Sequence, residues 1–463
     1  SQGISFVISI LLARILLPEQ YGVIAMVQVF IVLANVFVTA GFSSSLIQKK
    51  DADDLDFSTI FYCTFTMSLL MYAILFVSAP WIAAFYDMPQ LCKVTRVVGL
   101  TLIITSYQTV QHAYVSRNMI FKKNFYATSV AVALSGVIGV VMAYKGFGVW
   151  ALVAQTLSSN LFNTVTLMAI VPWKPKRIFS FDRAKSLMNY GSKILASSLV
   201  NAVYKEFNQL IIGKFYSAAD LALYNRGRHL PSLVVTNMDT TIRSVLFPAM
   251  SNNSDNPDRI RNMLRRGMKT GSYITFFGLT LLAICSRSIV LILLTEKWVA
   301  CVPYMQVYCI SQMFMMMSGY NIQAMKALGR SEEVLKLEVF KKPVFIILII
   351  IAANISVMAV IYATVLNALY ALMMNLGPTR RLLGYKFKEQ IMDMVPALLL
   401  CVLVAAVTLP ISLLNWNAFL VLLIQVVVAI SVYVLASITF KVDSFYYCKD
   451  VVLEIFNKKI RKR

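Results

Sequence analysis

Residues 12–22 read LARILLPEQYG, and residues 212–222 read IGKFYSAADLA, which matches them without a gap at an offset of 200 residues. In both stretches an apolar helix ends, a short turn follows, and another long helix begins. The match places Gln20 on Asp220. Six apolar segments separate the copies, so both would have the same orientation in a membrane. We therefore expect two parallel lobes, related by an axis along the membrane normal, with a substrate site between them.

The composition of the whole chain agrees with a membrane protein. The 463 residues are 59% hydrophobic and 14% charged, and the mean hydropathy is +0.72. A soluble domain could not keep so much apolar surface out of water, so the bilayer must be its solvent. We predict an all-α integral membrane protein with about fourteen transmembrane helices. The predicted spans are residues 1–17, 22–41, 58–80, 97–114, 125–144, 149–171, 186–212, 229–250, 268–288, 303–325, 339–354, 356–376, 391–411 and 417–440.

The repeat and the spans together predict five parts. They are an N-lobe with the first six spans (1–171), an inter-lobe linker (172–185), a C-lobe with the next six spans (186–376), two extra C-terminal spans (391–440) and a basic tail (441–463). About 15 residues precede Pro18, fewer than the roughly 20 that a span needs. We therefore expect the N-terminal part of the first span to precede Ser1.

Basic residues alternate between the polar gaps. With a cytoplasmic start, 31 of the 43 Lys and Arg residues fall in cytoplasmic gaps or the tail, 7 in outer gaps, and 5 within or at the ends of spans. The positive-inside rule then predicts that both termini are cytoplasmic. The net charge of +22 is explained by this topology and by anionic lipid, so we expect no nucleic-acid partner.

Motifs for covalent chemistry are absent from the sequence. It contains no GxSxG, Walker A or Rossmann pattern, no CxxC among seven cysteines, and no ligand spacing around its two histidines. We expect no enzyme activity, no cofactor and no metal site. The acids of QKKDADDLDF (48–57) are interpreted as a solvated helix start in preference to a nucleotide-sugar or metal site. The gap 251–267 is predicted to form a short amphipathic helix capped by Asn256.

Polar residues follow one face of two neighbouring spans. In the seventh span they are Tyr190, Lys193, Ser197, Asn201, Tyr204 and Asn208, with Lys205 at the edge; in the eighth they are His229, Ser232, Thr236, Asp239, Thr240 and Arg243. The first two spans carry milder stripes, which include Asn35. Cations inside a bilayer cost several kcal/mol unless they face water, a partner or a ligand. The stripes therefore predict a cationic cavity that prefers an anion such as phosphate. The alternative is that they are helix-packing contacts, with Asp239 and Arg243 a simple i,i+4 ion pair.

Several motifs resemble those of a known family. They are LARILLPEQYG (12–22), GFSSSLIQKKDADDLDFSTIFY (41–62), RNMIFKKN (117–124), YNRGRHL (224–230), VLFPAMS (245–251), TEKW (295–298) and ALGRSE (327–332). The chain resembles the polysaccharide biosynthesis proteins that flip lipid-linked oligosaccharides (Wzx-like, WzxC/TuaB branch). These belong to the multidrug/oligosaccharidyl-lipid/polysaccharide (MOP) exporter superfamily, whose fold is MATE-like. The resemblance implies alternating access between two lobes around a cavity lined by the first, second, seventh and eighth spans. It also implies that the two extra spans form a groove for a polyprenyl tail.

The leading interpretation is a flippase of the bacterial inner membrane. Its substrate would be an undecaprenyl-diphosphate-linked repeat unit, carried from the cytoplasmic to the outer leaflet for surface polysaccharide. Lys193, Lys205 and Arg243 would pair with the diphosphate, beside Asp239. Asn201, Tyr204 and Asn208 would contact sugar hydroxyls, and Arg14 would be a gate or phosphate contact. Partners would be membrane lipid and the polymerase and export machinery. The alternatives are a drug or cation antiporter of the same superfamily, a membrane glycan polymerase or ligase, and a scaffold for export.

Overall fold

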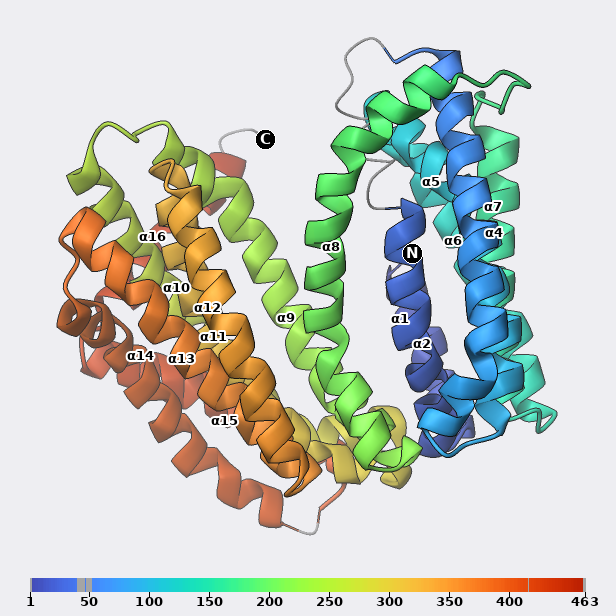
Figure 1. The fold of residues 1–463 in the computed structure, drawn as a ribbon. Helices are drawn as coiled ribbons and strands as arrows, with labels where there is room; N and C mark the ends of the chain where they lie inside the picture. Colours follow the sequence, from blue (N-terminus) through green and yellow to red (C-terminus); the bar gives the residue numbers. More distant parts are fainter. Residues whose placement is uncertain (1, 40–45, 47–51, 415, 461–463) are drawn as a thin grey trace. The chain divides into compact units, whose positions relative to one another are not determined.

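The computed structural model describes residues 2–39, 46, 52–414 and 416–460, and every regular element in these ranges is a helix (Figure 1). Two compact units, Ser1–Ala222 and Leu223–Arg463, divide the chain. The helices of the first unit are α1 (Gln2–Ile15), α2 (Pro18–Thr39), α4 (Asp54–Phe85), α5 (Gln90–Arg117), α6 (Phe121–Tyr144), α7 (Val149–Ile170) and α8 (Phe181–Phe215).

Helix α9 (Ala218–Ser251) begins in the first unit and continues into the second. The remaining helices of the second unit are α10 (Pro257–Leu294), η1 (Glu296–Cys301), α11 (Val302–Ala327), α12 (Ser331–Ala353), α13 (Val357–Leu383), α14 (Phe387–Thr408), η2 (Leu409–Leu413), α15 (Ala418–Thr439) and α16 (Asp443–Ile460). The two units follow from packing, whereas the predicted lobes rest on the repeat. The lobe boundary at 172–185 therefore stays a prediction.

The all-helical membrane fold predicted from the sequence is confirmed. One long helix lies at each predicted span, and eight helical segments of the described chain are long and apolar enough to cross a membrane. These eight contain α2, α4, α6, α10, α11, α13, α14 and α15. Large apolar side chains such as Trp81 and Ile355 are 70% and 73% exposed. Apolar surface of this kind is stable against lipid tails rather than water.

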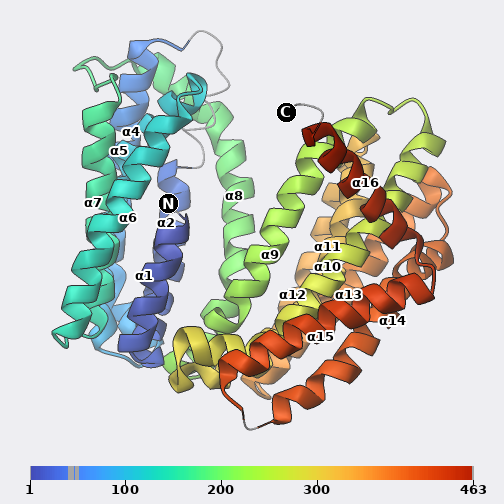
Figure 2. The same ribbon diagram turned by 180° about the vertical axis from the view of Figure 1, so that it is seen from behind.

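Neighbouring helices in each unit pack as hairpins, and one further helix contacts several of them. In the first unit α4 packs with α5 and α6 with α7, while α2 lies against α4, α5 and α8. In the second unit α10 packs against α11, α14, α15 and α16, and the α14–η2–α15 hairpin lies along it (Figure 2). The Tyr433 hydroxyl donates to the Tyr273 carbonyl at 2.6 Å, and Tyr273 bonds Ser437 at 2.9 Å. These bonds fix α15 on α10.

The two copies of the repeat form the same turn. The Leu17 amide donates to the side-chain oxygen of Gln20 at 3.0 Å, and the Ser217 amide donates to that of Asp220 at 3.2 Å. Each bond satisfies an amide at the start of a helix, where no backbone acceptor is available. The positions paired by an offset of 200 residues therefore have the same structural role.

Gly22 belongs to the first copy and lies against the second. A Cβ on Gly22 would overlap the backbone carbonyl of Ala218, where α9 begins. The absence of a side chain therefore allows the start of α9 to pack directly on α2.

The predicted amphipathic helix is capped as expected but is not a separate element. The Asn256 side chain accepts from the Arg259 amide at 3.0 Å, and Pro257 is the first residue of α10. The prediction of a short helix in 251–267 was wrong, because α10 continues without a break to Leu294. No residue after 267 breaks the helix, so the amphipathic turns and the membrane span form one rod of 38 residues.

The inter-lobe linker is bound to the start of α4. The amides of Lys176 and Ser180 donate to the hydroxyls of Ser58 and Thr59 at 3.1 and 3.2 Å. Arg183 contacts Asp53 at 3.0 Å and Asp56 at 2.9 Å.

The acidic motif at this point begins a helix, as predicted, but is not wholly solvated. Asp53 and Asp56 form a capping box, and Asp56 is fully buried. A buried carboxylate needs a partner of opposite charge, and Arg183 supplies it. Asp51 lies outside the described residues.

Candidate functional site

Helix α8 carries a cation within its predicted span, 186–212. At 1.5 Å per residue, Lys205 lies about 15 Å from the end of α8 at Phe215. Lys205 is exposed, so its own unit does not cover it. No ion pair of Lys205 is found among the described residues, and the neighbouring Glu206 accepts a hydrogen bond from Gln209. An intramembrane ammonium in this position needs water or an anion.

The rest of the α8 stripe lies on both sides of this height. Asn201 is exposed, Tyr204 is half-buried and Asn208 is only 8% exposed. The backbone of Lys193 belongs to α8, but its side chain lies outside the described residues. Lys193 lies about 18 Å from Lys205 along the helix axis. The sequence predicts that both residues lie on one face. The structure adds that one continuous helix contains both, which allows the distance between them to be calculated.

The predicted pair on α9 is present as an ion pair. The Nε atom of Arg243 lies 2.8 Å from Oδ2 of Asp239, and the two side chains are 59% and 35% exposed. This is the i,i+4 geometry that the sequence analysis considered as the simple alternative. Asp239 lies about 31 Å from the start of α9 at Ala218. The pair adds no net charge to the stripe, so the cationic character rests on the lysines of α8.

The candidate residues of α1 and α2 lie far from one another. Arg14 is exposed in the last turn of α1, next to the α1–α2 turn. Lys214, its counterpart in the repeat, pairs with Asp87 at 3.3 Å. Asn35 lies near the other end of α2, and its buried side-chain oxygen has no hydrogen-bond partner among the described residues. Arg14 and Asn35 therefore cannot contact one small group together.

A buried cation in the second unit was not predicted from the sequence. Lys341 was counted with the basic residues of a cytoplasmic gap, although the predicted span 339–354 contains it. It lies within α12 and is only 6% exposed. Its ammonium contacts Glu338 at 2.5 Å and donates to the side-chain oxygen of Asn375 at 3.2 Å. The signal was the spacing of Glu338 and Lys341 by three residues beside an apolar run. The part of the chain that the structure describes holds no group of three or more His, Cys, Asp or Glu able to bind a metal ion.

The chain is similar in sequence to several known proteins. A family model described as "Polysaccharide biosynthesis protein" matches residues 11–303. The succinoglycan biosynthesis transport protein ExoT of Rhizobium meliloti is 25% identical over 334 residues, which cover 71% of this chain and 66% of that protein. The teichuronic acid biosynthesis protein TuaB of Bacillus subtilis is 25% identical over 310 residues, with 65% and 63% covered. The chain thus spans just under two thirds of the length of both.

A third relative and two solved structures extend the comparison. The lipopolysaccharide biosynthesis protein WzxC of Escherichia coli is 21% identical over 403 residues, with 85% of this chain and 80% of that protein covered. An inward-closed structure of the lipid II flippase MurJ has a TM-score of 0.78 at 14% identity and covers 95% and 97% of the two chains. An inward-facing multidrug MATE transporter of the MOP superfamily has a TM-score of 0.64 at 15% identity, with 83% and 95% covered.

The solved structures bear on the fold alone, and the family rests on the sequence match. The MurJ and MATE structures confirm the MATE-like, all-helical fold that the family resemblance implied. The resemblance noted in the sequence motifs is likewise confirmed by the named relatives. Because the family match covers well over half of its length, the chain belongs to the polysaccharide biosynthesis protein family.

Proposed function

We propose that this protein is a flippase that moves an undecaprenyl-diphosphate-linked oligosaccharide from the cytoplasmic to the outer leaflet of the bacterial inner membrane. Lys205, an exposed cation on α8 within the predicted span 186–212, is the observation that carries the proposal. Membership of a polysaccharide biosynthesis family and a fold similar to that of a lipid II flippase support it. The 31-to-7 distribution of basic residues supports cytoplasmic termini.

The proposed mechanism is alternating access without covalent chemistry. The polyprenyl tail stays in hydrocarbon, while the diphosphate and sugars follow the polar face of α8. Lys193 and Lys205 are about 18 Å apart along the axis, so they would meet the diphosphate one after the other. Asn201, Tyr204 and Asn208 would bond sugar hydroxyls, Asn35 would add an acceptor, and Arg14 would act at the outer end. A diphosphate approaching Arg243 would compete with Asp239 for its guanidinium.

The proposal is tested by Lys205→Gln, with Lys185→Gln as the control. Lys185 is exposed on the same helix but precedes the predicted span, so its loss removes the same charge outside the membrane. We expect Lys205→Gln to reduce surface polysaccharide at least about tenfold, because one lost charge-assisted contact is worth about 1.5–3 kcal/mol. Lys185→Gln should export normally. Both proteins should reach the membrane in equal amount, and wild-type export by Lys205→Gln would contradict the proposed role.

The location of stranded substrate separates a flippase from an enzyme. A strain lacking the protein should accumulate single repeat units on the lipid carrier at the inner leaflet, because no bond of the substrate changes. A missing polymerase would leave single units at the outer leaflet, and a missing ligase would leave long polymer there. Finding the units already outside would overturn the flippase assignment.

A further inference from the structure

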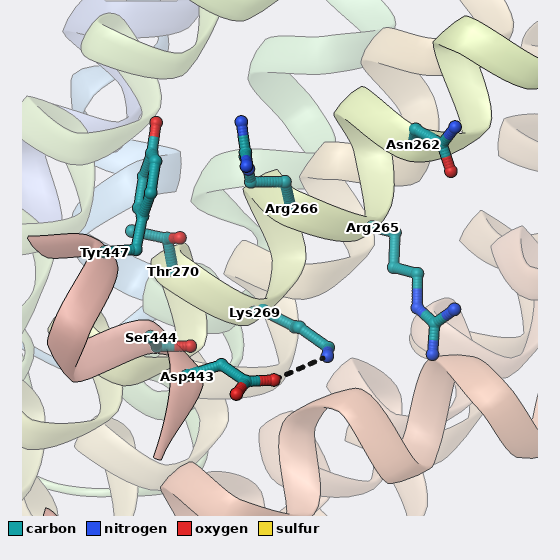
Figure 3. Close-up of a pocket in the computed structure, with 8 residues that line it drawn as sticks. All are labelled: Asn262, Arg265, Arg266, Lys269, Thr270, Asp443, Ser444 and Tyr447. Atoms are coloured by element: carbon teal, nitrogen blue, oxygen red, sulfur yellow. Dashed lines mark ion pairs between the residues drawn. The ribbon is translucent and has the colours of Figure 1, made fainter. Parts of the chain in front are cut away.

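A basic hollow of about 410 Å³ lies between the first turns of α10 and the start of α16 (Figure 3). Its lining residues are Asn262, Arg265, Arg266, Lys269, Thr270, Asp443, Ser444 and Tyr447. The α10 members recur every three or four residues, which places them on one face of the helix. All of them lie within the second unit and outside the polar stripes of α8 and α9.

The three cations of this hollow are held in different ways. Arg265 makes two bonds to the Asp393 carboxylate, at 2.7 and 3.2 Å. Lys269 lies 3.5 Å from Asp393 and 3.6 Å from Asp443, and Asp443 is 87% exposed. An ion pair of that length and exposure contributes little and opens readily.

Arg266 is the cation most available to a ligand. Its guanidinium stacks over the Tyr447 ring at 4.7 Å, and it has no carboxylate partner among the described residues. In Figure 3 Arg266 and Tyr447 point the same way, whereas Lys269 points toward Asp443. Stacking on an aromatic face orients a guanidinium and leaves its N–H donors free for an anion.

An apolar groove continues from the basic hollow along α10. A middle hollow of about 200 Å³ includes Lys269, Tyr273 and Asp443, and so joins the two ends. The groove beyond it, of about 420 Å³, is lined by Tyr273, Ile274, Phe277, Tyr433, Phe445, Cys448, Lys449 and Leu453. Ile274 and Leu453 are 44% and 48% exposed. The basic hollow, the middle hollow and the apolar groove thus form one row along α10. This row changes from cationic to apolar in the direction in which α10 enters its candidate membrane span.

We propose that this row is a binding site for one anionic phospholipid, with the headgroup phosphate on Arg266 and Lys269 and an acyl chain in the groove beside Ile274. A phosphate at Lys269 replaces the weak contact with Asp443, and the Arg266 fork matches two phosphate oxygens. A soluble anion would bind only in the basic hollow. A phospholipid would occupy the basic hollow with its phosphate and the apolar groove with its acyl chain. The occupant would fix the amphipathic helix α16 at the membrane surface.

The test is lipid titration of the purified, delipidated full chain followed by native mass spectrometry. The probes are phosphatidylglycerol, zwitterionic phosphatidylethanolamine and inorganic phosphate. We expect Arg266→Gln to weaken phosphatidylglycerol binding about fivefold, because a basic residue near a lipid surface is worth about that factor. Arg259→Gln is the control. Arg259 is exposed on α10 about two turns before Arg266, and it does not line the row.

A second variant tests the apolar end without changing charge. Ile274→Trp fills the groove, and it should weaken phosphatidylglycerol binding while leaving any binding of inorganic phosphate unchanged. Equal melting temperatures for all variants exclude misfolding as the cause. Equal binding of the two lipids, equal loss in Arg266→Gln and Arg259→Gln, or full displacement of lipid by inorganic phosphate would each overturn the proposal.

Discussion

At the scale of one residue, Gly22 joins the two copies of the repeat. Any Cβ there meets the Ala218 carbonyl, which is backbone and cannot rotate away. We expect Gly22→Ala to destabilise the protein by about 1–3 kcal/mol, the usual cost of overpacking. Gly278→Ala is the matched control, because a Cβ at that helical glycine meets nothing within 4 Å. Thermal unfolding in detergent measures both, and an equal effect of the two changes would contradict the close contact.

The sequence predicted which helices carry the candidate residues, but not their burial or their pairing. It predicted one helix with Asn201 and Lys205 on a shared stripe, and both are exposed residues of α8. It did not show where along α8 and α9 these residues lie, because the ends of the two helices come from the structure. Nor did it find that Asp56 and Lys341 are buried, because Arg183 and Asn375, which contact them, come from other helices.

At the scale of elements, we expect the docking of the linker on α4 to make the Arg177–Ile178 bond resistant to trypsin. Ser58 and Thr59 are fully buried and bind the amides of Lys176 and Ser180. The double variant Ser58→Ala, Thr59→Val removes two hydrogen bonds worth about 0.5–1.5 kcal/mol each. Cleavage of the purified protein should then accelerate at least about fivefold, since proteolysis follows the population of the opened segment.

The control for this experiment is Ser78→Ala. Ser78 also lies on α4, but its hydroxyl bonds only to the Leu75 carbonyl of the same helix. Cleavage at the linker should not change in this variant. Unchanged cleavage in the double variant as well would show that other contacts, such as the Arg183 pair, hold the linker.

The start and end of a helix were harder to predict from the sequence than the existence of the helix, as α10 shows. The sequence separated an amphipathic turn region from the following span at residue 267, because composition changes there. A helix ends only where backbone bonding or a breaker residue ends it, and α10 meets neither before Leu294. A change in hydropathy predicts where a helix enters lipid, whereas a capping residue such as Asn256 predicts where the helix begins.

At the scale of the whole molecule, the charge distribution predicts which loops face the cytoplasm. Single cysteines placed at Lys174, Asn252 and Lys386, in a variant without the native cysteines, should resist an impermeant thiol reagent in intact cells. Cysteines at Lys145 and Trp416 should react, because those gaps are predicted to face outward. Labelling at the first three positions would contradict both the orientation and the fourteen-span arrangement.

The turn shared by residues 17–20 and 217–220 has an evolutionary consequence. One copy uses the amide of Gln20 and the other the carboxylate of Asp220, yet both accept a hydrogen bond from the residue three positions earlier. This pattern is what a gene duplication leaves when selection acts on an acceptor oxygen and not on residue identity. An ancestor with half as many helices would have needed a second copy of itself to complete the fold. Fusion of the two genes would then have freed each half to acquire its own charges, and at this offset Lys205 of α8 aligns with the uncharged Ser5 of α1.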